Sequence, residues 1–164
     1  MTGNLLILGA GQYGCVAKET AQAMGCFNRI DFLDDHNPVA VGKMDTLPER
    51  VQEYDCVFVA IGNPALRLRL LKEAEQAGFQ LARLVHPSAV VMPSVKLSGG
   101  VIVEAQAVIN TNAVVELGCL ISAGAVVNHD CRLAEGCHVD CNATVSARSQ
   151  MPANTKVPCG TVYV

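Results

Sequence analysis

The sequence predicts two domains: one half of a doubly wound α/β fold over residues 1–84, and a parallel β-helix over residues 85–164. Two observations support this prediction. A glycine-rich G-x-G-x-x-G segment directly follows a short apolar run near the N-terminus, as in the strand, turn and helix of a nucleotide-binding unit. From residue 85 onward, an aliphatic residue or Met recurs at every sixth position.

Residues 1–84 alternate short apolar runs with amphipathic segments, as parallel α/β units do. Strands are expected over residues 4–8, 29–33, 56–61 and 80–85, and helices over residues 15–24, 46–51 and 65–77. About four parallel strands correspond to one mononucleotide-binding half of a doubly wound fold, whereas NAD normally uses two halves. A single nucleotide, or a small molecule linked to one, therefore fits this domain better than NAD.

The candidate ligand-binding residues of this domain follow its strands. Gly9, Gly11 and Gly14 form a turn that opens a helix, where free backbone N–H groups favour a phosphate. Asp34 and Asp35 come at the end of the second strand, where open α/β sheets bind ligands. Two simpler interpretations stay open at this point: a tight turn without a ligand, and a solvated acidic turn.

The repeat of the second domain begins at Val85 and continues without interruption. Its large positions are Val85, Val91, Leu97, Val103, Ile109, Val115, Ile121, Val127, Leu133, Val139, Val145, Met151 and Val157. Four residues after each of them stands a small or β-branched side chain, usually preceded by a turn former. A period of six is typical of a parallel β-helix, in which three hexads close one coil. A β-sandwich with regular turns would not require an apolar residue at every sixth place.

Composition excludes several classes of function. The net charge of −3, without a basic cluster, argues against nucleic-acid binding. The apolar runs are far shorter than the ~20 residues of a membrane span, and residues 1–4 are no signal peptide, so we expect a cytoplasmic protein. The eight cysteines are then expected to be thiols. Cys141 and Cys159 stack in the coil, but without C-x-x-C spacing we expect no metal site there.

Histidine is the residue type most suited to acid–base chemistry near neutral pH. His36 lies in a polar loop, and His86 lies at the domain junction. His129 and His138 both fall outside the interior columns of the repeat. They are separated by half a coil, so in one chain they should lie on opposite sides and meet only across an interface between copies. A metal-dependent enzyme built on His86, His129 and His138 stays open as an alternative.

Five segments together resemble the sialic acid O-acetyltransferase and bacillosamine-type sugar N-acetyltransferase family of hexapeptide-repeat acyltransferases: GAGQYG from Gly9, FLDD from Phe32, AIGN from Ala60, HPSA from His86 and NHDC from Asn128. The resemblance extends over nearly the full length. It implies a Rossmann-like nucleotide-sugar domain, a left-handed β-helix, a homotrimer, and acetyl-CoA as the acyl donor without a metal.

The resemblance also implies roles for single residues. His129 matches the general base, Asp130 the acidic residue that supports it, and His138 a histidine that contacts the acetyl-CoA thioester. Gly9, Gly11 and Gly14 would line the pyrophosphate of a nucleotide sugar, Asp34 and Asp35 would contact its base, and Asn63 of the AIGN segment would belong to the same substrate site.

The expected function is therefore acetyl-CoA-dependent acetylation of an amino sugar or sugar hydroxyl, with a nucleotide-linked substrate. The alternative is a non-catalytic trimeric sugar-binding or scaffold protein. Typical family members carry one or two further coils after the position of Val164, and after His129 the only basic side chains are Arg132, Arg148 and Lys156. We therefore expect weak acetyl-CoA binding, with CoA and 3′-dephospho-CoA bound almost equally.

Overall fold

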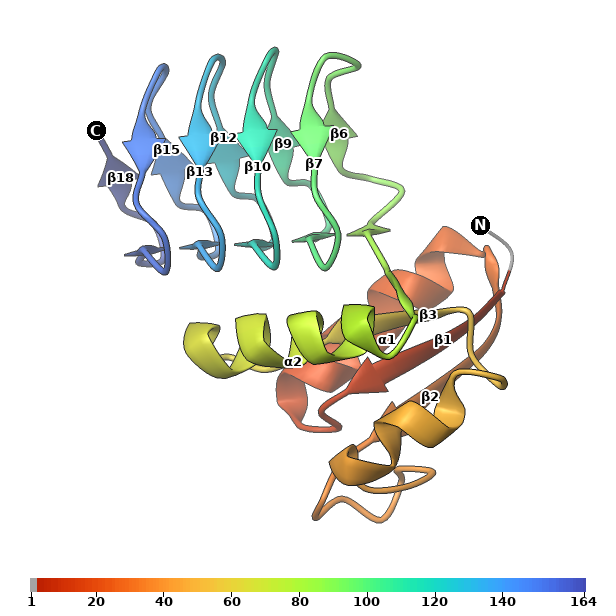
Figure 1. The fold of residues 1–164 in the computed structure, drawn as a ribbon. Helices are drawn as coiled ribbons and strands as arrows, with labels where there is room; N and C mark the ends of the chain where they lie inside the picture. Colours follow the sequence, from red (N-terminus) through yellow and green to blue (C-terminus); the bar gives the residue numbers. More distant parts are fainter. Residues whose placement is uncertain (1–2) are drawn as a thin grey trace. The chain divides into compact units, whose positions relative to one another are not determined.

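The structure is a computed structural model that describes residues 3–164. The chain divides after Ala82 into two compact units, an α/β unit and a repeat unit (Figure 1). No helix within residues 3–164 is long and apolar enough to cross a membrane.

The α/β unit is built around a parallel sheet with strand order β2-β1-β3-β4. Its elements are β1 (Gly3–Leu8), α1 (Gln12–Met24), β2 (Phe27–Leu33), the 3₁₀ helix η1 (Met44–Arg50), β3 (Cys56–Val59), α2 (Pro64–Gln76) and β4 (Gln80–Leu81). The two central strands are almost entirely buried, as expected for parallel strands covered on both faces. The crossover helix α1 ends before Gly25, which is in the left-handed region, as the sequence predicts, although it begins at Gln12 and not at residue 15. The Asn63 side chain, which the resemblance assigns to the substrate site, caps α2 by accepting the Leu66 N–H at 3.0 Å.

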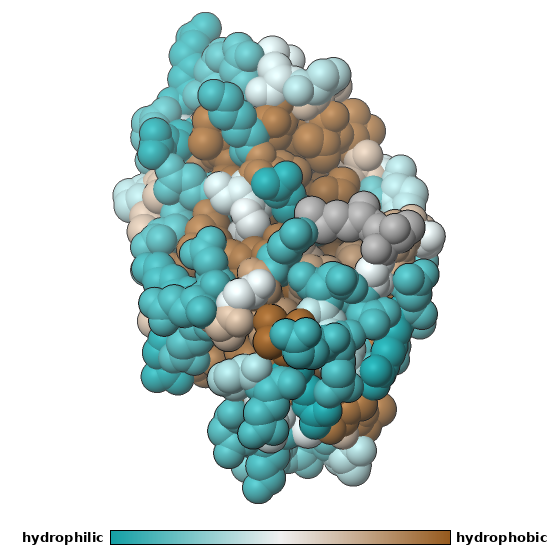
Figure 2. Space-filling view, turned by 45° about the vertical axis from the view of Figure 1, so that its right-hand side comes forward, coloured by the Kyte–Doolittle hydropathy of each residue, from teal (hydrophilic) through white to brown (hydrophobic). Residues whose placement is uncertain are grey.

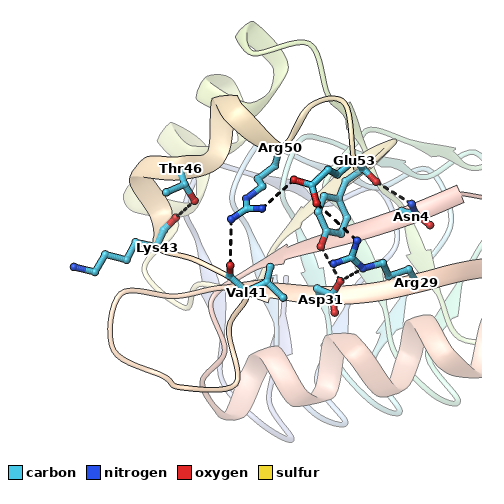
Figure 3. Close-up of polar contacts among 9 residues, drawn as sticks. Asn4, Arg29, Asp31, Val41, Lys43, Thr46, Arg50 and Glu53 are labelled. Atoms are coloured by element: carbon cyan, nitrogen blue, oxygen red, sulfur yellow. Dashed lines mark hydrogen bonds and ion pairs between the residues drawn. The ribbon is translucent and has the colours of Figure 1, made fainter.

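A polar network ties the edge strand β2 to the segment after η1 (Figure 3). The hydroxyl group of Tyr54 donates to Asp31 at 2.7 Å, and the Arg29 guanidinium pairs with Asp31 and lies over the Tyr54 ring. Arg50 pairs with Glu53 at 2.9 Å. Because Tyr54 is 2% exposed, its hydroxyl group needs this partner inside the protein.

The repeat unit is a parallel β-helix of two-residue strands, which confirms the predicted fold class. The strands are β5 (Leu84–Val85), β6 (Val90–Val91), β7 (Lys96–Leu97), β8 (Ile102–Val103), β9 (Val108–Ile109), β10 (Val114–Val115), β11 (Leu120–Ile121), β12 (Val126–Val127), β13 (Arg132–Leu133), β14 (His138–Val139), β15 (Thr144–Val145), β16 (Gln150–Met151), β17 (Lys156–Val157) and β18 (Val162–Tyr163). They form three sheets, and each strand pairs with the strand one coil away, as Val114 pairs with Lys96 and Arg132. From Val101 to Val145 the predicted large and small columns form one continuous buried core, and Met151 and Val157 extend its large column, whereas Ser149 and Thr155 are partly buried and Thr161 is exposed.

The corners of the coil depend on left-handed backbone conformations. Non-glycine residues with positive φ are Gln106, Asn112, Asp130, Asn142, Arg148 and Asn154, and glycines occupy several other corners. Asn and Asp tolerate this region better than other side chains, which explains why the turn-former column repeats with the same period as the core.

Two predicted elements differ from the structure in more than the positions of their ends. The single strand expected over residues 80–85 is two strands: β4 belongs to the α/β sheet, whereas Leu84 of β5 pairs with Ile102 in the β-helix. The expected helix over residues 46–51 is the 3₁₀ helix η1, which contains Pro48, a residue without an N–H to donate.

The face of the molecule drawn in Figure 2 mixes polar and apolar residues. Among residues 3–164, the large hydrophobic side chains that are clearly exposed are all valines, including Val39, Val90 and Val162. Scattered exposed valines are normal on a protein surface and do not by themselves mark a binding site.

Candidate active site

A histidine and an aspartate form a hydrogen-bonded pair at one corner of the β-helix. His129 and Asp130 lie in the turn between β12 and β13, with Nδ1 of His129 2.8 Å from Oδ2 of Asp130. Hydrogen bonds from His129 and Asn112 hold the pKa of Asp130 below its ordinary value, so this carboxyl group is ionised at neutral pH. Because an ionised carboxylate only accepts hydrogen bonds, Nδ1 of His129 donates, and in the neutral imidazole the lone pair is then on Nε2.

The backbone of this turn explains the geometry of the pair. Asp130 has φ of 57°, and its N–H donates to Thr111 O of the preceding coil at 2.9 Å. The N–H of His129 donates to the Asn128 side chain at 2.8 Å. Both side chains of the pair are therefore presented outward, 43% and 45% exposed. The arrangement can take a proton from a group that approaches the corner from solvent.

His138 lies on strand β14, in a separate polar cluster. Its Nε2 is 3.0 Å from Ser122 Oγ, and Ser122 is 3% exposed. Nε2 also lies 3.9 Å from Oδ1 of Asp140, whose other oxygen pairs with Lys156 at 2.9 Å. The hydrogen bond from Lys156 holds the pKa of Asp140 below its usual range.

The two histidines occupy opposite sides of the coil. Strands β12 and β13, which flank His129, belong to two different sheets, and His138 belongs to the third sheet. In a coil with three sheets, the corner between two of them lies opposite the third. His129 and His138 of one chain therefore do not share a site within that chain.

The glycine-rich loop of the α/β unit has two glycines that the fold itself requires, one for its backbone conformation and one for close packing. Gly9 has φ of 103°, and a Cβ on Gly14 would lie 2.2 Å from Gly9 O. Gly11 is different, because its φ is −76° and a Cβ there would have no heavy atom within 4 Å. Gly11 is thus the position in this loop where open space remains beside the N-terminus of α1.

Asp34 binds the glycine-rich loop of its own chain. Its Oδ2 accepts the Ala10 N–H at 2.8 Å, and its Oδ1 accepts the N–H groups of His36 and Asn37 at 2.9 and 3.0 Å. The Asn37 side-chain amide donates to Ala10 O at 2.6 Å, so both the backbone N–H and the backbone C=O of Ala10 are held. These backbone hydrogen bonds, first that from Ala10, lower the pKa of Asp34. The predicted contact of Asp34 with a nucleotide base competes with this bonding.

A pocket of about 310 Å³ opens beside the carboxyl ends of β2 and β3. Its polar lining comes from Asp34, Asp35, His36 and Arg69, and apolar side chains including Ile61 complete it. Asp35 also accepts the Met44 N–H at 3.0 Å through one oxygen. Of the predicted substrate residues, only Asp34 and Asp35 line this pocket.

Sequence reasoning missed Arg69 and His36 as pocket residues. In the sequence, Arg69 is one of several charged residues away from the apolar side of the helix over residues 65–77, and His36 lies in a polar loop. The available signal was position: His36 directly follows the acidic pair at a strand end, and Arg69 lies in the second turn of the helix after the next strand. No group of three or more metal-ligating side chains occurs within residues 3–164.

Known proteins match the whole chain. The PglD N-terminal domain family matches residues 4–74. The acetyltransferase domain of PglB from Neisseria gonorrhoeae FA1090, in complex with acetyl coenzyme A, is 30% identical, with a TM-score of 0.86, over 99% of this chain and 85% of that one. PerB from Caulobacter crescentus, in complex with CoA and GDP-perosamine, is 34% identical, with a TM-score of 0.82, over 100% of this chain and 90% of that one.

A more distant structure supports the fold alone. WeeI from Acinetobacter baumannii AYE is 15% identical, with a TM-score of 0.57, over 96% of this chain. An α/β unit followed by a left-handed β-helix of hexapeptide repeats, together with the close matches, defines an acetyltransferase of the hexapeptide-repeat type. The chain belongs to the bacillosamine-type sugar acetyltransferase family, which confirms the resemblance seen in the sequence.

Proposed function

We propose that this acetyltransferase transfers the acetyl group of acetyl-CoA directly to an amino or hydroxyl group of a nucleotide-linked sugar, with His129 as the general base. The observation that supports this most strongly is the bond between His129 Nδ1 and Asp130, which leaves Nε2 able to accept a proton. Two proteins that match this chain have related ligands bound: the acetyltransferase domain of PglB is in complex with acetyl coenzyme A, and PerB is in complex with CoA and GDP-perosamine.

The proposed reaction needs one proton acceptor and one acyl donor. His129 Nε2 takes the proton of the attacking amine or hydroxyl while that group adds to the thioester carbonyl carbon. The tetrahedral intermediate then collapses, the C–S bond breaks, and the CoA thiolate leaves. The thioester is reactive enough that no covalent enzyme intermediate is needed, and Asp130 stabilises the imidazolium that forms.

The position of His138 supports a site shared between copies. His138 is proposed to contact the thioester, yet it lies on the side of the coil opposite His129. Packing of β-helices around a three-fold axis would bring the His138 face of one copy to the His129 corner of the next. We therefore propose a homotrimer, with each acetyl-CoA bound between two copies.

The nucleotide is proposed to bind to the α/β unit. The pocket beside Asp35 and Arg69 would take the base, and the open space at Gly11 would admit the pyrophosphate toward the N-terminus of α1. Asp34 would keep the glycine-rich loop in shape through Ala10. Asn63, which caps α2, is assigned to the substrate site only through the family segment that contains it.

The decisive experiment measures acetyl transfer to a panel of UDP-, CMP- and GDP-linked amino sugars by mass spectrometry of the product. His129→Ala is expected to lower kcat by about 10²–10⁴-fold, the usual range for a lost general base, and Asp130→Asn by less. Light scattering should show the same trimer for the wild type and both variants. A His129→Ala variant within a few-fold of the wild type would refute the assigned base, and a stable monomer would refute the shared site.

A further inference from the structure

The pair formed by His129 and Asp130 needs support from outside itself. Both side chains are close to half exposed, and solvent-exposed pairs of this kind contribute little by themselves. An exposed carboxylate that meets only one donor can also rotate away from it. If the pair is to present Nε2 of His129 in one orientation, another group has to fix the Asp130 carboxylate.

Asn112, one coil earlier, contacts that carboxylate directly. Its Nδ2 donates to Oδ1 of Asp130 at 3.0 Å, while Oδ2 of Asp130 faces His129. The two carboxylate oxygens thus have two different donors on two different coils. This fixes the plane of the carboxylate, because rotation about its last bond would break both hydrogen bonds.

The backbone of Asn112, which carries this side chain, is itself held in place by the neighbouring coils. Asn112 and Asp130 occupy the same corner of successive coils, with φ of 60° and 57°. The N–H of Asn112 donates to Ser94 Oγ, one further coil away, at 2.9 Å. The N–H of Asp130 donates to Thr111 O, next to Asn112, at 2.9 Å. Ser94, Asn112 and Asp130 therefore form a bonded column along one edge of the β-helix.

We propose that Asn112 is a positioning residue of the acetyltransferase site, which orients the Asp130 carboxylate so that Asp130 holds the Nδ1–H tautomer of His129. The proposal rests on the function proposed above for His129. Asn112 does not touch the reacting atoms, and it acts through Asp130.

The charged groups near Asp130 do not orient its carboxylate as Asn112 does. His129 and Arg148 are the charged groups that act on Asp130, and Arg148 occupies the same corner one coil later. Arg148 acts on Asp130 only through its charge and is the weakest of the effects on the Asp130 pKa, whereas Asn112 donates a hydrogen bond to it. A donor of fixed direction orients a carboxylate, while a positive charge that donates no hydrogen bond to it does not.

The test uses Asn112→Gly, which removes the amide and keeps a residue that adopts positive φ without strain. Asn154→Gly is the matched control, because Asn154 is also an asparagine at an exposed corner, with φ of 61°. Asn112→Asp is the third variant, and it would place a second carboxylate beside Asp130. The three variants are compared with the wild type by kcat, KM, pH profile and carbon-detected NMR titration of the Asp130 carboxyl group.

Asn112→Gly is expected to lower kcat about tenfold, well below the effect of losing the base itself, with KM for acetyl-CoA unchanged. Its NMR titration should show the Asp130 pKa raised, since a donor to the charged form is lost, and Asn112→Asp should raise it further by repulsion. The acid limb of the kcat profile should move to higher pH in the same order. Asn154→Gly should match the wild type in all of these measurements.

The readouts separate this inference from the function on which it rests. A wild type that transfers no acetyl group to any sugar refutes the proposed function, and the NMR titration then decides alone whether Asn112 acts on Asp130. An active wild type, together with an Asn112→Gly variant of unchanged kcat and unchanged Asp130 titration, overturns the positioning role.

Discussion

Replacing Gly14 with Ala should destabilise the α/β unit, whereas replacing Gly11 should leave its stability almost unchanged. The new Cβ at Gly14 would lie 2.2 Å from Gly9 O, more than 1 Å inside ordinary van der Waals contact, with Phe32 Cε1 at 3.4 Å limiting any shift. Overpacking of this severity is worth about 3 kcal/mol, and the better helix propensity of Ala returns about 1 kcal/mol. The expected net loss is about 2 kcal/mol, or on the order of 10 °C in Tm for a unit of this size.

Gly11→Ala meets a different environment. The residue has φ of −76°, and the space at its Cβ is open within 4 Å. Ala is a poorer N-cap than Gly, but it also lowers the entropy of the unfolded chain, so the two effects leave stability within about 0.5 kcal/mol of the wild type. Because the methyl group would enter the space proposed for the pyrophosphate, we expect nucleotide-sugar affinity to fall at least about tenfold.

Urea denaturation followed by circular dichroism at 222 nm measures the pair of variants. Both α-helices belong to the α/β unit, so the helical signal reports on that unit. Calorimetric titration with the nucleotide sugar then gives the affinities. A Gly14→Ala variant with the wild-type midpoint, or a Gly11→Ala variant that is equally destabilised, would refute the packing argument.

Two further predictions concern buried polar groups of the α/β unit. Arg67 is 1% exposed and donates to two backbone carbonyls of the loop after β3. Replacing it with Met should therefore lower the free energy of unfolding, measured in urea, by about 2–3 kcal/mol. The control Arg69→Met, at an exposed position of the same helix, should change that free energy by less than about 0.5 kcal/mol. Burial, and then the bond to Asp31, raise the pKa of Tyr54 to about 12 from an ordinary value near 10. Because the folded state holds this proton more tightly, the α/β unit should lose stability as the pH rises from about 10 to about 12. Urea melts at a series of pH values should show that Tyr54→Phe removes this loss. Tyr163→Phe, in the β-helix, should not remove it.

The β-helix was predictable because one period fixes several levels of structure together. An aliphatic residue at every sixth place defines the interior, and the stacking of every third hexad then defines the strand partners. The same register stacks Asn112 on Asp130, eighteen residues later, so their contact also follows from the period. The sixfold pattern was read as extending only from Val85, so the pairing of Leu84 with Ile102 was missed.

The α/β unit was less predictable, because its contacts join residues that are distant in the chain. The strand, turn and helix around the glycine-rich loop followed from local sequence. The role of Asp34 did not, since the Ala10 N–H that it accepts lies in the loop of another strand. An acidic residue at a strand end suits a ligand and a neighbouring backbone equally well, and only the folded loop distinguishes them.

The pairing of each strand with the strand one coil away restricts how such a chain can change length in evolution. Loss or gain of a single residue would turn every later interior side chain toward solvent. Loss or gain of one hexad would preserve the core but move each later residue to a different side. Only whole coils can be exchanged without disturbing both, and a coil inserted between Asn112 and Asp130 would still separate the two side chains. Among homologues of different length, duplicated coils are therefore expected outside the interval from residue 112 to residue 130.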